Sequence, residues 1–229
     1  MPQFKNSFNK LNLIEASEVG DLVRVSELLA SGVDPNTVNG YGQTSLYWAS
    51  GNLHLEVLEE LLRFGADPNF ADKLGRTPLY WASDGGHLEV VKLLLSAEGG
   101  GADPNTYIGS GYGTSLHAAS AAGHLEVVKA LLSAQNGGAD PNIRDEYDET
   151  PLHWASQAGQ LEVVEKLLLF GADPNIVSTF NLTPLEKAIR NRHTEVVEML
   201  LNYFPSLSGL SLRSTIKFRI NISSISHLL

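Results

Sequence analysis

The sequence TPLYWASDGGHLEVVKLLL, residues 77–95, decides how this chain folds because it describes two short helices joined by a glycine turn. Thr77 is a good N-cap residue, and the proline after it suits the first helical position, where no amide hydrogen is needed. Gly86 interrupts the first helical pattern, and the apolar residues that follow it recur at the spacing of one helix face. The segment therefore predicts a helix–turn–helix unit.

The same unit recurs along the chain. A Thr-Pro/Ser-Leu triplet repeats at intervals of 33, 37, 36 and 33 residues, beginning at Thr44, Thr77, Thr114, Thr150 and Thr183. A second signature, Gly-Ala/Val-Asp-Pro-Asn, begins at Gly32, Gly65, Gly101, Gly138 and Gly171. Its glycine suits the left-handed position that ends a helix, and its proline prevents the helix from continuing. A period of this length is typical of a solenoid, in which each unit buries its apolar face against its neighbours.

The turn before each threonine is expected to contain a residue with positive φ. The residue two positions before the threonine is of a type that tolerates this conformation in four units, namely Gly42, Gly75, Asp148 and Asn181. In the remaining unit Tyr112 falls at this place, between two glycines. We therefore expect the turn around Tyr112 to differ from the others.

These residues resemble the ankyrin repeat family, whose pattern is approximately D-x-x-G-x-T-P-L-H-x-A-A-x-x-G-H-x-E-V-V-x-L-L-L-x-x-G-A-D-x-N. The resemblance covers about residues 11–203, and the proline within Gly-Ala-Asp-Pro-Asn departs from the pattern. It implies an all-α ankyrin-repeat solenoid with projecting hairpin-like turns beside a concave groove. The expected organisation is a lead-in at 1–10, a repeat domain at 11–205 with units at about 11–39, 40–72, 73–108, 109–145, 146–178 and 179–205, and a C-terminal tail at 206–229.

The amino-acid composition excludes or disfavours several classes of function for this protein. The 229 residues are 43% hydrophobic and contain no apolar run of the roughly 20 residues that span a bilayer, so we expect no membrane insertion. The absence of cysteine excludes disulfides, thiolate metal sites and a cysteine nucleophile. A net charge of −10 disfavours nucleic-acid binding and favours a basic or neutral partner. The N-terminus lacks the apolar stretch of a secretory signal, so we expect a cytoplasmic protein, with the nucleus as the alternative.

The polar residues form no constellation that indicates catalysis, a metal or a cofactor. Two repeat positions account for most of the histidines, namely His54, His87, His124 and His193 at one and His117 and His153 at the other. Their recurrence indicates a framework role in which the imidazole hydrogen-bonds to neighbouring backbone. We therefore expect a protein that is not an enzyme and that holds no cofactor.

The groove side carries an unusual set of aromatic residues. With the threonine numbered position 4, position 8 lies opposite the buried face of the first helix and, in an ankyrin stack, faces the groove. It is occupied in turn by Glu15, Trp48, Trp81, Ala118, Trp154 and Lys187, which include all three tryptophans. Position 7 adds Tyr47 and Tyr80, and the turn tips carry Tyr41, Leu74, Tyr112, Tyr147 and Phe180.

We interpret these residues as an aromatic ladder that binds a partner protein or an extended peptide, because aromatic side chains dominate interface energetics. Small residues at position 12 are expected to leave the indole faces uncovered. Proline rings, or an arginine stacked on an indole, would suit such a surface on an acidic protein. The alternative is that the tryptophans are ordinary framework and that Tyr47 and Tyr80 stand in for the framework histidine.

The sequence thus predicts a monomeric, non-enzymatic interaction scaffold or adaptor. One alternative is a ubiquitin-ligase adaptor, because Pro205, Leu207, Leu210, Arg213, Ile216 and Lys217 are similar, with a gap, to the start of a SOCS box. A microbial ankyrin effector, or a module that inhibits or assists an enzyme, remains compatible as well. Ankyrin proteins also undergo asparagine hydroxylation with a leucine eight residues upstream, a spacing found at Asn36, Asn69 and Asn175.

Overall fold

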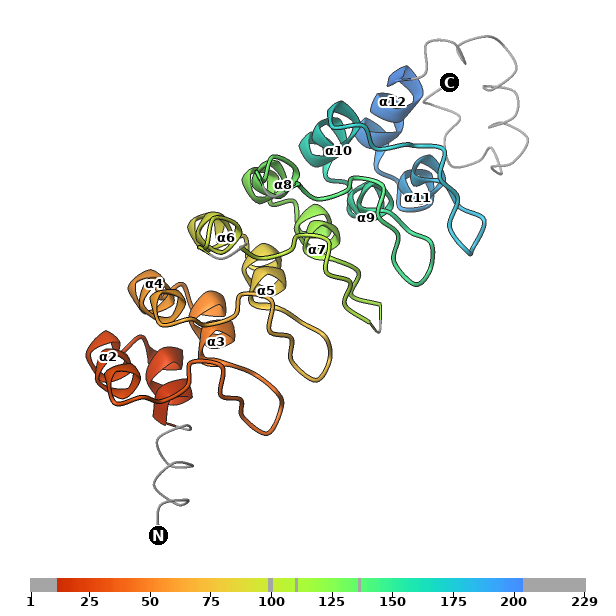
Figure 1. The fold of residues 1–229 in the computed structure, drawn as a ribbon. Helices are drawn as coiled ribbons and strands as arrows, with labels where there is room; N and C mark the ends of the chain where they lie inside the picture. Colours follow the sequence, from red (N-terminus) through yellow and green to blue (C-terminus); the bar gives the residue numbers. More distant parts are fainter. Residues whose placement is uncertain (1–11, 99–100, 110, 136, 204–229) are drawn as a thin grey trace.

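The computed structural model describes residues 12–98, 101–109, 111–135 and 137–203. Helix pairs stand side by side in a row, and a loop projects from each unit on the same side of the row (Figure 1). Residues 12–19 are helical, and they are followed by α2 (Leu22–Ala30), α3 (Ser45–Gly51), α4 (Leu55–Arg63), α5 (Pro78–Asp84), α6 (Leu88–Leu95), α7 (Ser115–Ala122), α8 (Leu125–Leu132), α9 (Pro151–Ala158), α10 (Leu161–Leu169), α11 (Pro184–Arg190) and α12 (Thr194–Tyr203). The expected all-α solenoid is confirmed.

The first helix of each unit begins where the threonine predicts. Thr77 Oγ1 accepts a hydrogen bond of 3.2 Å from the backbone N–H of Tyr80, and Pro78 takes the first helical position. In α7 and α9 the third helical residue is a histidine, whose Nδ1 accepts from the backbone N–H of the capping threonine. These bonds satisfy amide groups that a helix start leaves without intrahelical partners.

The core is a continuous stripe between the two rows of helices. The predicted buried face of the first helix is confirmed at Leu79, Ala82 and Ser83, which are all fully buried. The second helices contribute leucines such as Leu131 and Leu167, also fully buried. Because each helix packs on the equivalent helix of the next unit, α7 lies between α5 and α9 and α8 lies between α6 and α10 (Figure 1).

The turns adopt the backbone conformations that the sequence predicts. Gly42, Gly75, Asp148 and Asn181 all have positive φ, at 81°, 83°, 55° and 57°. The turn that contains Tyr112 differs as expected, because the positive φ values fall on Gly111 and Gly113 instead. One expectation is wrong: the left-handed residue after α8 is Gly137, with φ 95°, and not Gly138.

Leu53 provides a stability prediction because it occupies a left-handed position that is glycine in three other units. Its φ is 63° and its side chain is 52% exposed, whereas the equivalent residues are Gly86, Gly123 and Gly159. Leu53→Gly is expected to raise the free energy of unfolding by about 0.5–1 kcal/mol, since the relief of left-handed strain exceeds the entropy gained by the unfolded chain. Urea denaturation followed by circular dichroism measures the change.

A matched control for this variant is Glu59→Gly, at an exposed site in the middle of α4. A glycine in a helix interior is expected to lower stability by about 1 kcal/mol relative to a good helix former. Equal destabilisation by both substitutions would contradict the assignment of strain to Leu53.

The expected lead-in at 1–10 and the tail at 206–229, with its SOCS-box-like residues, lie outside the described residues. Within the part of the chain that the structure describes, no helix is long and apolar enough to cross a membrane.

Candidate binding surface

The helices that carry the predicted aromatic ladder stand in the row from which the loops project (Figure 1). Trp48, Trp81 and Trp154 come from α3, α5 and α9, and each is half-buried. The indole Nε1 of Trp48 is buried without a hydrogen-bond partner among the described residues. The three tryptophans therefore share a position in the repeat but not an environment.

Tyr47 and Tyr80 are framework residues, as the alternative interpretation held. Their side chains are 4% and 6% exposed, and burial raises the pKa of Tyr80 to about 12. Tyr47 packs edge-on against Trp48 and against Trp81, with ring centroids 5.9 Å and 5.7 Å apart. Neither tyrosine offers the exposed contact that the sequence-based ladder assigned to it, and we leave both out of the surface proposed below.

The expectation that the indole faces are uncovered is wrong at Trp81. The guanidinium of Arg76 lies 5.0 Å from the centre of the Trp81 ring and 5.9 Å from that of Tyr47. Asp72 Oδ2 accepts hydrogen bonds from Arg76 Nε at 2.9 Å and from Nη2 at 2.7 Å. Burial opposes the ionisation of Asp72, but these bonds hold its pKa below the usual value. The guanidinium of Arg76 thus covers the indole of Trp81.

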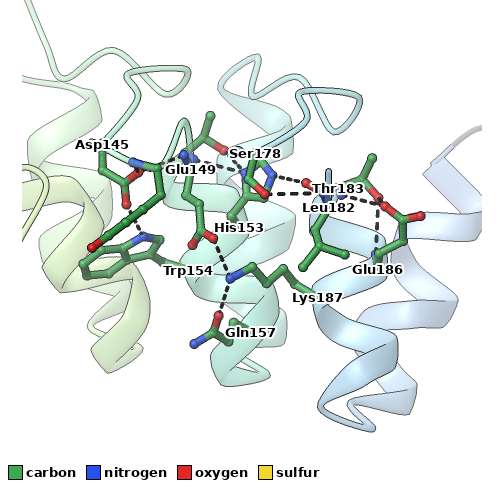
Figure 2. A network of polar contacts seen from close by, with 12 residues as sticks. Asp145, Glu149, His153, Trp154, Gln157, Ser178, Leu182, Thr183, Glu186 and Lys187 are labelled. Atoms are coloured by element: carbon green, nitrogen blue, oxygen red, sulfur yellow. Dashed lines mark hydrogen bonds and ion pairs between the residues drawn. The ribbon is translucent and has the colours of Figure 1, made fainter. Parts of the chain in front are cut away.

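Trp154 has a different partner. Its indole Nε1 donates a hydrogen bond of 3.0 Å to Asp145 Oδ2, as Figure 2 shows. Asp145 Oδ1 accepts from the backbone N–H groups of Tyr147 and Glu149, at 2.8 Å and 2.9 Å, which fixes the carboxylate in the turn. This carboxylate is 6% exposed and forms no ion pair within the described residues.

An ion pair joins this unit to the last one. Lys187 Nζ lies 2.6 Å from Glu149 Oε1 and donates a hydrogen bond of 2.7 Å to Gln157 Oε1 (Figure 2). The Lys187 and Glu149 side chains are 13% and 9% exposed. The ammonium group is held toward Glu149 and Gln157, and it is not stacked on any aromatic ring that the structure describes.

A concave pocket of about 540 Å³ opens among these groups. Its walls come from three successive units and combine aromatic rings with acidic and amide groups. Its lining includes Asp145, Tyr147, Glu149, Trp154, Phe180 and Lys187. The volume lies within the range of known ligand sites, and the mixture of apolar walls and a few polar groups is typical of them.

The loop tips carry exposed apolar side chains, as the sequence predicts. The exposed fractions are 73% for Tyr41, 49% for Leu74, 36% for Tyr112, 43% for Tyr147 and 62% for Phe180. The rings of Tyr147 and Phe180 lie 5.7 Å apart at the mouth of the pocket. Tyr107, 44% exposed, belongs to the same set and was missed because the repeat register places it before the tip.

The framework role of the histidines is confirmed. The Nε2 atoms of His54, His87, His124 and His193 each donate to a backbone carbonyl of the preceding unit, at distances between 2.9 Å and 3.2 Å. His117 and His153 are fully buried and donate from Nε2 to the carbonyls of Glu149 and Leu182 in the following unit. Burial lowers the pKa of both, to about 4 for His153.

The predicted hydroxylation sites differ in their contacts. Asn36 donates to the carbonyl of Gly65 and accepts from the N–H of Asp67, and Asn69 makes the equivalent bonds to the next unit. Among the described residues, Asn175 bonds to Asp173 of its own turn. Hydroxylation remains a prediction at all three sites.

The described residues contain no group of three or more His, Cys, Asp and Glu side chains that fits a metal ion. What they do present is a helical solenoid with projecting loops and exposed apolar loop tips, an architecture of repeat proteins that bind other proteins. A family model described as ankyrin repeats matches in three copies, over residues 13–108, 100–178 and 116–208. The chain belongs to the ankyrin repeat family.

Solved structures agree with this assignment. The crystal structure of EF0377, an ankyrin repeat protein, is similar with a TM-score of 0.74 and 27% sequence identity, over 83% of this chain and 96% of that chain. No curated protein matches the sequence. Ankyrin repeats generally mediate protein–protein interaction and are typically non-enzymatic modules.

Proposed function

We propose that this protein is a non-enzymatic scaffold or adaptor that binds a partner polypeptide across its loop tips and the pocket beside Trp154. The observation that carries the proposal is the row of exposed apolar tips, Tyr41, Leu74, Tyr112, Tyr147 and Phe180, along one side of the stack. A buried aromatic side chain removes about 150–250 Å² from water, so a few such residues supply most of the energy of an interface.

The tips are held in place before a partner binds. The backbone N–H of Lys73 donates to the carbonyl of Tyr41 at 3.1 Å, and that of Thr179 donates to the carbonyl of Tyr147 at 2.8 Å. Each bond ties one loop to the next. A surface ordered in this way loses little conformational entropy on binding, which favours affinity.

The charge of the protein supports a basic partner. The net charge is −10, and Asp145 and Glu149 lie in the pocket beneath the tips. Such a field accelerates the encounter with a basic polypeptide and repels nucleic acid. We propose a protein or extended peptide, basic or proline-containing, bound by a monomer in the cytoplasm or nucleus.

A matched pair of variants tests the surface. Tyr147→Ala with Phe180→Ala removes the two tips at the pocket mouth, whereas Phe170→Ala removes an exposed ring, 41% accessible, next to α10. In affinity capture from source cells, read by quantitative mass spectrometry, we expect the tip variant to lose specific partners about tenfold or more. The Phe170 variant should retain them. Equal recovery by both variants would exclude the tips as the binding surface.

A further inference from the structure

Two units of the solenoid carry the same aspartate and tryptophan but have opposite charges at the residue before the capping threonine. Counted from the capping threonines Thr77 and Thr150, Asp72 is equivalent to Asp145 and Trp81 to Trp154. The backbone contacts are equivalent too: Asp72 Oδ1 accepts from two N–H groups of its turn, as Asp145 Oδ1 does. The residue before the threonine is Arg76 in the first unit and Glu149 in the second.

In the first unit this constellation holds a guanidinium. Arg76 binds Asp72 through two nitrogens and lies over the Trp81 ring, and its side chain is 17% exposed. In this unit a guanidinium therefore pairs with the aspartate and covers the face of the indole. A planar cation is well suited because it can form two parallel hydrogen bonds and stack on an aromatic face at once.

In the second unit no cation from the described residues takes the place that corresponds to that of Arg76. Glu149 points to Lys187, and Asp145 is left with the indole N–H and two backbone donors (Figure 2). The pocket of about 540 Å³ lies at this place, walled by Trp154, Tyr147 and Phe180. Two carboxylates against one ammonium group leave the lining with an excess of negative charge.

From this comparison we propose that the pocket receives the guanidinium of an arginine side chain from an extended partner peptide. The arginine stacks on Trp154 and neutralises Asp145, and the Tyr147 and Phe180 rings enclose its aliphatic stem. This inference rests on the proposed function and names the chemistry that its pocket recognises. It predicts that the positive charge of the guanidinium decides whether such a peptide binds here.

The test uses the full chain labelled with ¹⁵N at the tryptophan indoles, with the Trp154 signal assigned by its loss in Trp154→Phe. The probes are the peptide acetyl-Gly-Ser-Pro-Ala-Arg-Ala-Pro-Ser-Gly-amide and the same peptide with citrulline, a neutral isostere, in place of arginine. The arginine peptide should shift the Trp154 indole signal saturably at concentrations up to about 10 mM, and leave Trp48 unchanged. The citrulline peptide should bind about tenfold more weakly.

A variant can fill the pocket from within. Glu149→Arg combined with Lys187→Ala gives these two positions the residues found at the first unit, where Arg76 covers the indole and Ala118 stands in place of Lys187. It should abolish the peptide-induced shift while the protein stays folded, because the other unit already adopts this arrangement. Glu162→Gln, exposed on α10, changes the net charge by the same amount and should leave binding unchanged.

Three results would overturn the inference. Equal shifts from the arginine and citrulline peptides would show that the pocket does not recognise the positive charge. The absence of any Trp154 shift would show that the peptide does not bind in this pocket. A Trp154 shift caused by replacing Arg213, Lys217 and Arg219 with glutamine, without peptide, would reassign the pocket to the chain's own tail. None of these results decides the proposed function, which depends on the capture experiment with the Tyr147 and Phe180 variants.

Discussion

Replacing Leu131 with alanine is expected to lower the free energy of unfolding by about 2–5 kcal/mol, the range observed when a fully buried leucine leaves a cavity. The Leu131 side chain has no exposed surface and belongs to α8, which packs between α6 and α10. Interactions in a solenoid are confined to neighbouring units, so a defect here weakens the contacts that join the two halves of the stack. Urea denaturation followed by circular dichroism measures the loss.

Leu169→Ala serves as the control because it makes the same chemical change at a side chain that is 67% exposed, at the end of α10. It should change the stability by less than about 0.5 kcal/mol. A broadened or two-step transition in the Leu131 variant would indicate that the halves unfold separately. A loss below about 1 kcal/mol in the Leu131 variant would contradict the continuous core described above.

The features that the sequence predicts well are those decided within one unit. The helix starts at Thr77 and Thr150, and the positive φ at Asp148, depend on residues close in the chain and on local backbone sterics. Repetition strengthens these predictions, because each local pattern is seen several times in equivalent positions. The same argument predicts the framework histidines, whose backbone partners recur in each neighbouring unit.

The features that the sequence does not predict depend on side chains that meet between elements or units. Nothing in the register shows that Arg76 turns over Trp81, because its direction follows from the carboxylate of Asp72 in the folded turn. The ion pair between Glu149 and Lys187 joins residues of successive units, and Lys187 stands out in the sequence only as a departure from the tryptophan row. The chemistry of the pocket is therefore visible only in the structure.

The buried histidines predict a loss of stability in mild acid. In the folded protein His153 donates from Nε2 to the carbonyl of Leu182, and its Nδ1 accepts from the N–H of Thr150. A second proton on Nδ1 would face that N–H group and break the helix cap. Burial is the main reason that the pKa of His153 falls to about 4. The nearby Lys187 lowers this pKa further, whereas the hydrogen bond to the carbonyl of Leu182 and the charge of Asp145 act in the opposite direction.

The direction of the effect follows from comparing the two states. A histidine in the unfolded chain has a pKa of about 6.5, so above that pH the side chain is neutral in both states and costs nothing. As the pH falls from about 6.5 to about 4, His153 becomes protonated in the unfolded chain but stays neutral in the folded protein. This difference favours unfolding by up to about 3 kcal/mol. His117, whose pKa is also lowered by burial, adds to the loss.

His153→Tyr separates this effect from the titration of carboxylates. Tyrosine occupies the same repeat position in two other units, as buried Tyr47 and Tyr80, so the framework accommodates it. Asp72, whose pKa is below the usual value, loses its stabilising charge only at lower pH than the histidine window. In urea titrations between pH 7 and pH 5 we therefore expect the tyrosine variant to lose markedly less stability than the wild type. Parallel losses in the two proteins would show that His153 is not held neutral, and that its place between Thr150 and Leu182 tolerates the imidazolium.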